Sequence, residues 1–208
     1  MPTATVTTVT IPTPHGEARA HLHAAEGARG ALVLGHGAGG GVEAPDLVAA
    51  TEAAGRQGFS VALVEQPYRV AGRRSSPAAH HLDAAWLAVV DALTNNQLSG
   101  LPLIAGGRSA GARVACRTAG ATRAAAVLCL AFPLQPPARK GKDPSPSRQP
   151  ELDAVKVPML IVQGERDRFG MPEPGRNREV AVVKGDHSLR SDREAINIAV
   201  GRWLEKLD

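Results

Sequence analysis

Ser109 lies between two glycines in the segment Gly107-Arg108-Ser109-Ala110-Gly111, which directly follows an apolar run at residues 101–105. This pattern is typical of a sharp turn from a strand into a helix that pushes a serine hydroxyl outward, where it is free to act as a nucleophile. A side chain at either glycine would collide with the neighbouring strand or helix. The pattern therefore predicts nucleophilic catalysis at Ser109, and the alternative is a small residue in a tight turn.

Two further residues could activate this serine. Asp167 follows a buried run at residues 157–163, and His187 follows another at residues 179–184, so both come where a predicted strand ends. In this arrangement His187 takes the Ser109 proton, and Asp167 holds the imidazole in the required tautomer. The alternative for His187 is a surface-loop histidine with no catalytic role.

Asp167 has competitors for the role of acid. It could instead pair with the arginine on either side of it in a solvated loop. Glu165 and Asp186 are the other carboxylates nearby, but Asp186 directly precedes His187, and adjacent residues usually point apart. We therefore retain Asp167 as the predicted acid.

The glycine-rich loop at residues 34–41 allows two interpretations. In the first it is a dinucleotide fingerprint, with Glu65 at the end of the next strand as the ribose carboxylate. The matching glycines are Gly35, Gly37 and Gly40. However, the next predicted helix begins only at Pro45, too late for its amino end to meet a pyrophosphate.

In the second, favoured interpretation the loop helps to form an oxyanion hole. The Ala38 N–H, together with the Ala110 N–H directly after the nucleophile, would face the developing negative charge. Gly37 lies in the same turn and is a candidate substrate-contacting residue. Tyr68, Arg73 and Arg74 follow the strand that ends at Glu65, on the sheet edge where ligands of α/β proteins bind, and could recognise a carboxylate or phosphate. A solvated basic loop is the alternative.

The elements that must position these residues alternate between strands and helices. Strands are predicted at residues 31–34, 60–64, 101–105, 124–130, 157–163 and 179–184, and helices at residues 45–57, 77–93, 110–119 and 191–207. Two further strands at residues 3–13 and 17–25 read as an antiparallel hairpin, and Ser191 opens a capping-box pattern for the last helix. The pattern predicts an α/β fold: a three-layer sandwich with a mostly parallel sheet.

The segment at residues 132–156 is dense in proline and cannot hold a long helix. We therefore expect no cap domain, and an open site bordered by a mobile loop. The 208 residues, 43% hydrophobic and 21% charged, suit one domain over residues 1–208. No run approaches the roughly 18 apolar residues of a membrane helix. The N-terminus lacks a signal-peptide pattern, so we expect a cytoplasmic protein.

Charge and cysteine content exclude several other classes. The net charge of +4 comes from scattered arginines with small clusters at residues 73–74 and 139–142, and with one Tyr and three Phe the chain has little on which to stack bases. We expect no nucleic-acid or membrane partner, a small acyl substrate, and a monomer or homodimer. Metal-ligand spacing is missing around the histidines His21, His23, His80 and His81, so no metal is expected. Cys116 and Cys129 read as buried thiols rather than a disulfide.

Over nearly its whole length the chain resembles the α/β-hydrolase superfamily, within it the small lidless branch of dienelactone-hydrolase-like and testis-expressed-protein-like hydrolases. The motifs that carry the resemblance are Gly35-His36-Gly37-Ala38-Gly39-Gly40, Pro67-Tyr68-Arg69, Gly72-Arg73-Arg74, Gly107-Arg108-Ser109-Ala110-Gly111, Gln163-Gly164-Glu165-Arg166-Asp167 and Asp186-His187-Ser188. The resemblance implies Ser109 as nucleophile, His187 as base and Asp167 as acid. One departure is that residues 168–175 replace the helix that usually separates acid and histidine.

These observations together predict a serine hydrolase that cleaves a small ester, thioester or related acyl bond through an acyl-enzyme, without a cofactor. The second hypothesis is a catalytically idle interaction module that keeps the fold, because fold alone does not imply activity. The third hypothesis is a nucleotide-binding reductase.

Overall fold

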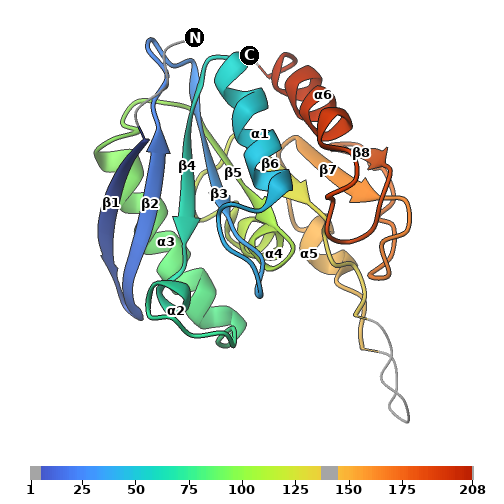
Figure 1. Cartoon of the computed structure of the whole chain (residues 1–208), viewed down its shortest axis with the longest axis horizontal. Helices are drawn as coiled ribbons and strands as arrows, with labels where there is room; N and C mark the ends of the chain where they lie inside the picture. Colours follow the sequence, from blue (N-terminus) through green and yellow to red (C-terminus); the bar gives the residue numbers. More distant parts are fainter. Residues whose placement is uncertain (1–5, 137–144, 208) are drawn as a thin grey trace.

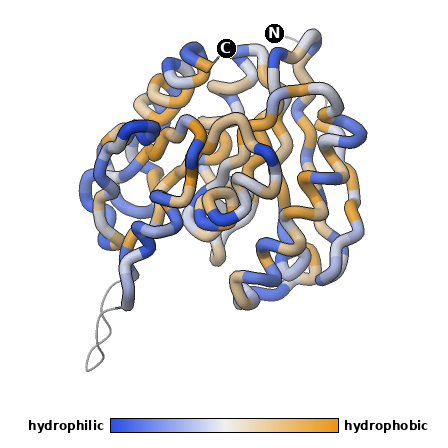
Figure 2. The backbone as a smooth tube through the Cα atoms, turned by 180° about the vertical axis from the view of Figure 1, so that it is seen from behind, coloured by the Kyte–Doolittle hydropathy of each residue, from blue (hydrophilic) through white to orange (hydrophobic). Residues whose placement is uncertain are grey.

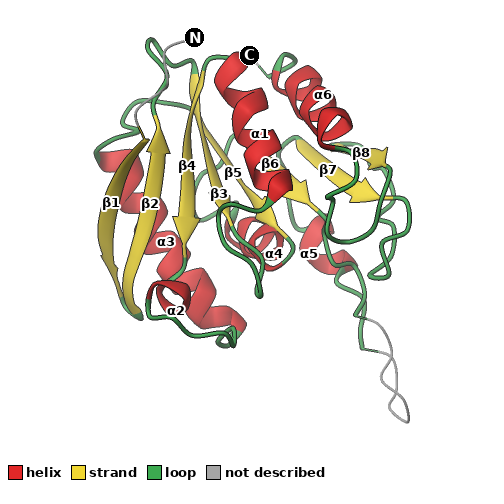
Figure 3. Ribbon diagram, in the orientation of Figure 1, coloured by secondary structure: helices red, strands yellow, loops and turns green. Residues whose placement is uncertain are grey.

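The computed structural model describes residues 6–136 and 145–207. Its centre is an eight-stranded sheet with the order β1-β2-β4-β3-β5-β6-β7-β8 (Figure 3). The strands are β1 (Val6–Thr13), β2 (Gly16–His23), β3 (Gly30–Gly35), β4 (Phe59–Glu65), β5 (Leu103–Arg108), β6 (Ala126–Leu130), β7 (Met159–Gly164) and β8 (Arg178–Val183). The helices are α1 (Pro45–Arg56), α2 (Pro67–Val70), α3 (Ala79–Asn95), α4 (Ala110–Thr118), α5 (Gln149–Asp153) and α6 (Arg193–Leu204).

The pairing of the strands follows from their sequences. β3 to β7 are buried almost throughout, as continuous apolar runs in a parallel sheet covered on both faces should be. β1 and β2 form an antiparallel hairpin, and β2 also pairs antiparallel with β4, so the hairpin extends one edge of the sheet. The predicted mostly parallel sheet with an antiparallel N-terminal hairpin is confirmed.

Helices cover both faces and divide the core in two. In Figure 1, α1 and α6 lie in front of the sheet, and α3 and α4 lie behind it. Trp86 and Phe132 are among the buried side chains behind the sheet, and Leu47 and Trp203 among those in front of it. Figure 2 shows the central strands as hydrophobic and the outer turns as hydrophilic. The predicted three-layer α/β sandwich is therefore confirmed, and the described residues include no cap domain.

Several details differ from the prediction. The N-cap of α6 is Asp192, whose side chain accepts a hydrogen bond from the Ala195 N–H at 3.1 Å, so assigning that role to Ser191 in a capping box was wrong. The short helix α2 was not predicted. In the described part of the proline-dense segment, α5 contains only 5 residues. Residues 137–144, including the basic cluster at 139–142 and the middle of the expected loop, lie outside the described residues.

The two cysteines face each other between α4 and β6. Both are buried and free, and their Sγ atoms are 3.5 Å apart, which confirms the predicted thiols. The hydrogen bond with Cys116, followed by burial, raises the pKa of the Cys129 thiol. Within the described residues, no helix is both long enough and apolar enough to cross a membrane.

Candidate active site

The backbone turns sharply at Ser109, between β5 and α4. Ser109 has a φ of 52° and a ψ of −106°, a conformation that costs a non-glycine residue of the order of 1–3 kcal/mol. Its N–H donates to the Leu130 carbonyl at 2.9 Å, which ties the turn to β6. A Cβ at Gly107 would lie 2.6 Å from the Gly35 carbonyl oxygen, and one at Gly111 would lie 2.3 Å from the same atom. The predicted collision at both glycines is confirmed.

Two hydrogen bonds link the side chains of Ser109, His187 and Asp167 in that order. The Ser109 Oγ is 2.9 Å from the His187 Nε2, and the His187 Nδ1 is 2.7 Å from the Asp167 Oδ2. The Asp167 side chain is fully buried, whereas the His187 side chain is 19% exposed. When the Nδ1 carries the proton and donates it to the carboxylate, the Nε2 is left to accept the serine O–H. That is the hydrogen-bond order required of a general base.

Two other donors hold the Asp167 carboxylate. The Phe169 N–H donates to Oδ1 at 2.9 Å, and the Gln163 Nε2 donates to Oδ2 at 2.8 Å. Gln163 is completely buried, and its Nε2 also lies 2.9 Å from the Gly170 carbonyl and 3.1 Å from the Phe132 carbonyl, so its two N–H groups are shared among three acceptors. The role of this glutamine was not predicted. The signal was an amide at the end of an otherwise apolar strand, because a buried amide requires partners.

The competing carboxylates point elsewhere. Glu165 is exposed and lies 3.8 Å from the guanidinium of Arg166. Asp186 is exposed and accepts hydrogen bonds from the Ser188 N–H and hydroxyl at 2.8 and 2.5 Å. In the described part of the chain, Asp167 is the carboxylate that contacts His187.

The glycine-rich loop does not have the geometry of a dinucleotide site. The helix that follows it begins at Pro45, beyond the glycine run, so this helix does not start inside the loop as a dinucleotide fingerprint requires. Glu65, the expected ribose carboxylate, contacts the Nε2 of His21 at 3.0 Å.

His36 holds this loop from inside. It is buried, its Nδ1 lies 2.8 Å from the Gly37 carbonyl, and its Nε2 accepts a hydrogen bond from the Gln66 N–H at 3.1 Å. Burial lowers the pKa of His36, so the imidazole is neutral at neutral pH and its Nδ1 proton is left to bond to Gly37.

Ala110, one of the predicted oxyanion donors, directly follows the nucleophile, and Gly37, the neighbour of the other predicted donor Ala38, lies close to it. Ala110 is the first residue of α4, and the N–H at that position has no acceptor within its own helix. A Cβ at Gly37 would lie 3.6 Å from the Ser109 Cβ, so the loop that contains Ala38 passes directly over the serine. The Tyr68 hydroxyl donates to the Ala38 carbonyl at 3.0 Å and so holds the Ala38–Gly39 peptide. The Ala38 N–H belongs to the preceding peptide, whose Gly37 carbonyl lies 2.8 Å from the His36 Nδ1.

A cavity of about 640 Å³ lies beside α2, at the carboxyl edge of the sheet. Tyr68 and Arg73, two of the candidate substrate-contacting residues, line it, and Arg19 adds a second cation. Arg74 is exposed and does not line this cavity. A second, much smaller cavity of about 10 Å³ is lined by both Tyr68 and Ala110, so Tyr68 lies between the large cavity and the nucleophile turn.

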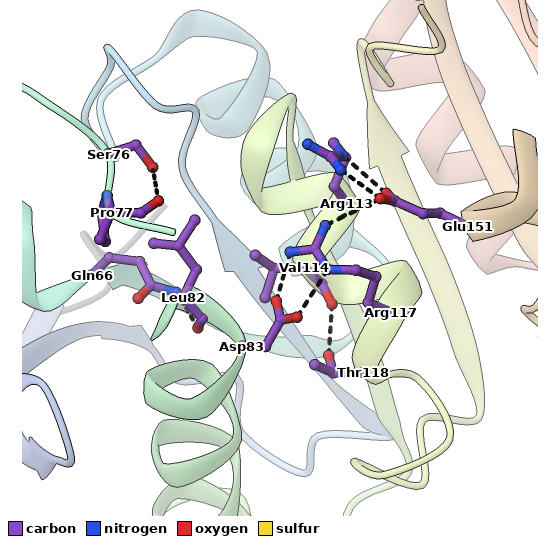
Figure 4. Close-up of polar contacts among 10 residues, drawn as sticks. All are labelled: Gln66, Ser76, Pro77, Leu82, Asp83, Arg113, Val114, Arg117, Thr118 and Glu151. Carbon is purple, nitrogen blue, oxygen red and sulfur yellow. Dashed lines mark hydrogen bonds and ion pairs between the residues drawn. The ribbon is translucent and has the colours of Figure 1, made fainter. Parts of the chain in front are cut away.

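Two arginines of α4 form ion pairs with neighbouring helices. Arg113 and Arg117 project from α4 (Figure 4). Arg113 contacts Glu151 of α5 at 2.5 Å, and Arg117 contacts Asp83 of α3 at 2.6 Å. All four side chains are partly buried.

The histidines considered as a metal cluster are dispersed over two elements. His21 and His23 lie on β2, whereas His80 and His81 lie on α3 and stack on each other. Among the residues that the structure describes, no group of three or more histidine, cysteine or acidic side chains is arranged to hold a metal ion.

A family model described as an alpha/beta hydrolase domain matches residues 28–197. The chain belongs to this α/β-hydrolase family. Among solved structures it is similar to an α/β serine hydrolase without a lid from Xanthomonas campestris, with a TM-score of 0.72, 18% identity, and coverage of 98% of this chain and 96% of that one. It is also similar to a dienelactone hydrolase from Anabaena variabilis, with a TM-score of 0.74, 16% identity, and coverage of 97% and 95%. A search of curated proteins found no significant match.

Proposed function

We propose that this α/β-hydrolase cleaves a small ester, thioester or related acyl bond by serine catalysis. The observation that carries the proposal is the hydrogen-bonded line from the Ser109 Oγ to the His187 Nε2 at 2.9 Å, and from the His187 Nδ1 to Asp167 at 2.7 Å. A strained serine, a base with a free acceptor nitrogen and a buried acid in one line are the parts that acyl transfer needs.

The chemistry then proceeds in two halves. In the first, the Ser109 Oγ attacks the acyl carbon while His187 takes the hydroxyl proton, and His187 then gives this proton to the leaving alcohol or thiol. The Ala38 and Ala110 N–H groups donate to the oxyanion of the tetrahedral intermediate. In the second half, His187 activates a water that releases the acid from the serine. Asp167 balances the charge of the imidazolium in both halves.

The cavity beside α2 is our candidate for the part of the substrate remote from the scissile bond. Arg73 and Arg19 line it together with one acidic residue, Glu17, so a carboxylate or phosphate on the substrate would meet a cavity with an excess of positive charge. Tyr68 connects the cavity to the Ala38 peptide, and Gly37 forms the surface above Ser109. Arg74 is a candidate for the outer rim.

The experiment is intact-mass analysis after treatment with a fluorophosphonate probe, because only an activated serine reacts readily with this electrophile. The native chain should gain one adduct, Ser109→Ala should gain none, and the control Ser188→Ala should still gain one, since Ser188 bonds only to Asp186 beside the site. A folded native chain that gains no adduct would overturn the proposal and favour an interaction module instead.

A further inference from the structure

Arg108, the residue before the nucleophile, contacts three separate segments through three nitrogen atoms. Its Nε lies 2.9 Å from the Asp46 Oδ2 on α1. Its Nη2 donates to the His187 carbonyl at 2.9 Å. Its Nη1 lies against the glycine-rich loop, since a Cβ at Gly37 would come within 2.6 Å of it.

The stability of the folded chain alone does not explain the buried ion pair between Arg108 and Asp46. The Asp46 side chain is completely buried, and that of Arg108 is only 17% exposed. The Asp46 Oδ1 accepts a hydrogen bond from the Leu47 N–H at 3.0 Å, whereas Oδ2 has the ion pair but no well-directed hydrogen bond. Burial, the largest effect, raises the pKa of Asp46 despite the opposing effect of Arg108. Burying a charged pair with incomplete compensation is weak evidence for a role in stability.

The segments that meet at Arg108 are those whose relative positions the proposed reaction requires to be fixed. The His187 carbonyl belongs to the loop of the base, Gly37 belongs to the loop of the proposed oxyanion donor Ala38, and Arg108 is bonded directly to the nucleophile. Asp46 lies in the first turn of α1, a helix that packs against α6, β4 and β5, so it supplies a fixed anchor.

We propose that Arg108, anchored by Asp46, is a positioning residue that sets the His187 loop and the Gly37 loop relative to Ser109. This proposal rests on the proposed serine chemistry. A planar guanidinium is suited to the task because it directs N–H groups to Asp46 and to the His187 carbonyl while its third nitrogen packs close to Gly37. A lysine ammonium on a flexible stem cannot keep both polar contacts in this fixed arrangement.

The test compares Arg108→Lys and Asp46→Asn with the wild type. A matched control is Arg117→Lys, because Arg117, on α4, is similarly buried at 20% exposed and makes a two-point ion pair with Asp83 (Figure 4). The readouts are the rate of fluorophosphonate labelling at Ser109, and kcat and KM for p-nitrophenyl acetate, all at a temperature where each variant is folded.

We expect labelling and kcat to fall by about 10- to 100-fold in Arg108→Lys, the effect of displacing a catalytic group by about 1 Å. KM should stay within about twofold of the wild-type value, because positioning of the base acts on the transition state. Asp46→Asn should likewise lower the labelling rate and kcat with little change in KM. Arg117→Lys should label at the wild-type rate. Wild-type labelling and kcat in both Arg108→Lys and Asp46→Asn would overturn the proposal.

A separate measurement distinguishes this proposal from the proposed function. The Leu189 N–H donates to the Asp186 carbonyl at 3.1 Å within the histidine loop, so its hydrogen exchange reports the order of that loop without any chemistry. In Arg108→Lys this exchange should be about tenfold faster, the factor expected when a charge-assisted hydrogen bond is lost. If the wild type does not label, the proposed serine chemistry is overturned. The positioning role of Arg108 is overturned separately if hydrogen exchange at Leu189 is the same in Arg108→Lys as in the wild type.

Discussion

Replacing Asp167 by asparagine tests the proposed acid without emptying its site. In the transition state His187 carries a positive charge 2.7 Å from a carboxylate that is completely buried. Two opposite charges with centres about 4 Å apart attract by about 4 kcal/mol at an effective dielectric constant near 20. Asparagine keeps the shape but not the charge. Since each 1.36 kcal/mol is a factor of ten, Asp167→Asn should lower the rate of acyl transfer by about 10³-fold.

The assay is the hydrolysis rate of p-nitrophenyl acetate together with fluorophosphonate labelling, with circular dichroism to confirm that each variant is folded. Asp186→Asn is the matched control, because it makes the same chemical change next to His187 in an exposed side chain that bonds to Ser188 instead. It should change the rate by less than threefold. If Asp167→Asn kept its rate within tenfold, or if Asp186→Asn lost as much, the assignment of the acid would be refuted.

The remaining predictions concern the scaffold of the site. Gly111→Ala should lower the free energy of unfolding by about 3 kcal/mol or more, because its Cβ would lie 2.3 Å from the Gly35 carbonyl oxygen. Gly39→Ala, which meets nothing within 4 Å, should change little in the same urea titration, and equal effects would contradict the packing argument. Because burial lowers the pKa of His36 below 6.5, its contribution to stability is present above that pH and is lost as the pH falls through the lowered pKa. The urea midpoint should therefore fall more steeply with decreasing pH in the wild type than in His36→Asn. Equal pH dependence of the two midpoints would contradict this role of His36. Gly201→Ala in α6, with no atom nearer than 3.8 Å to the new Cβ, should add about 0.5–1 kcal/mol of stability, and a lower melting temperature would contradict this.

The fold could be predicted because its strands are continuous apolar runs separated by helical patterns. Such runs occur only where both faces of a sheet are covered, so they specify a parallel sheet before any contact is known. The nucleophile turn could also be predicted, because the close packing around Ser109 requires glycine at Gly107 and Gly111 and so produces a recognisable sequence pattern.

The partners of other site residues leave no local signal. Arg108 reads as the variable position of its motif, and nothing near it in the sequence indicates Asp46 or His187 as partners. The buried Gln163 likewise acts through residues brought to it by the end of β7. Contacts of this kind depend on tertiary packing, which residue type and spacing do not encode. The same holds for Arg74, which the sequence could not separate from Arg73.

The short connection between acid and histidine shows how little structure the site needs here. β7 and β8 are neighbours in the sheet and pair in parallel, so residues 165–177 cross from one to the next without a helix. Local hydrogen bonds replace the helix: the Asp167 N–H donates to the Gly164 carbonyl at 3.0 Å, and the Gly170 N–H donates to the Asp167 carbonyl at 3.0 Å.

The two loops are also in direct contact. The Arg166 N–H donates to the Gly185 carbonyl at 2.9 Å, and a Cβ at Gly164 would lie 2.5 Å from the Asp186 carbonyl oxygen. Because adjacent parallel strands end at the same edge, a turn after each is enough to bring the Asp167 carboxylate to the His187 Nδ1. The geometry of the pair therefore depends on the β7–β8 register and on glycine at Gly164, and not on the helix that the chain lacks.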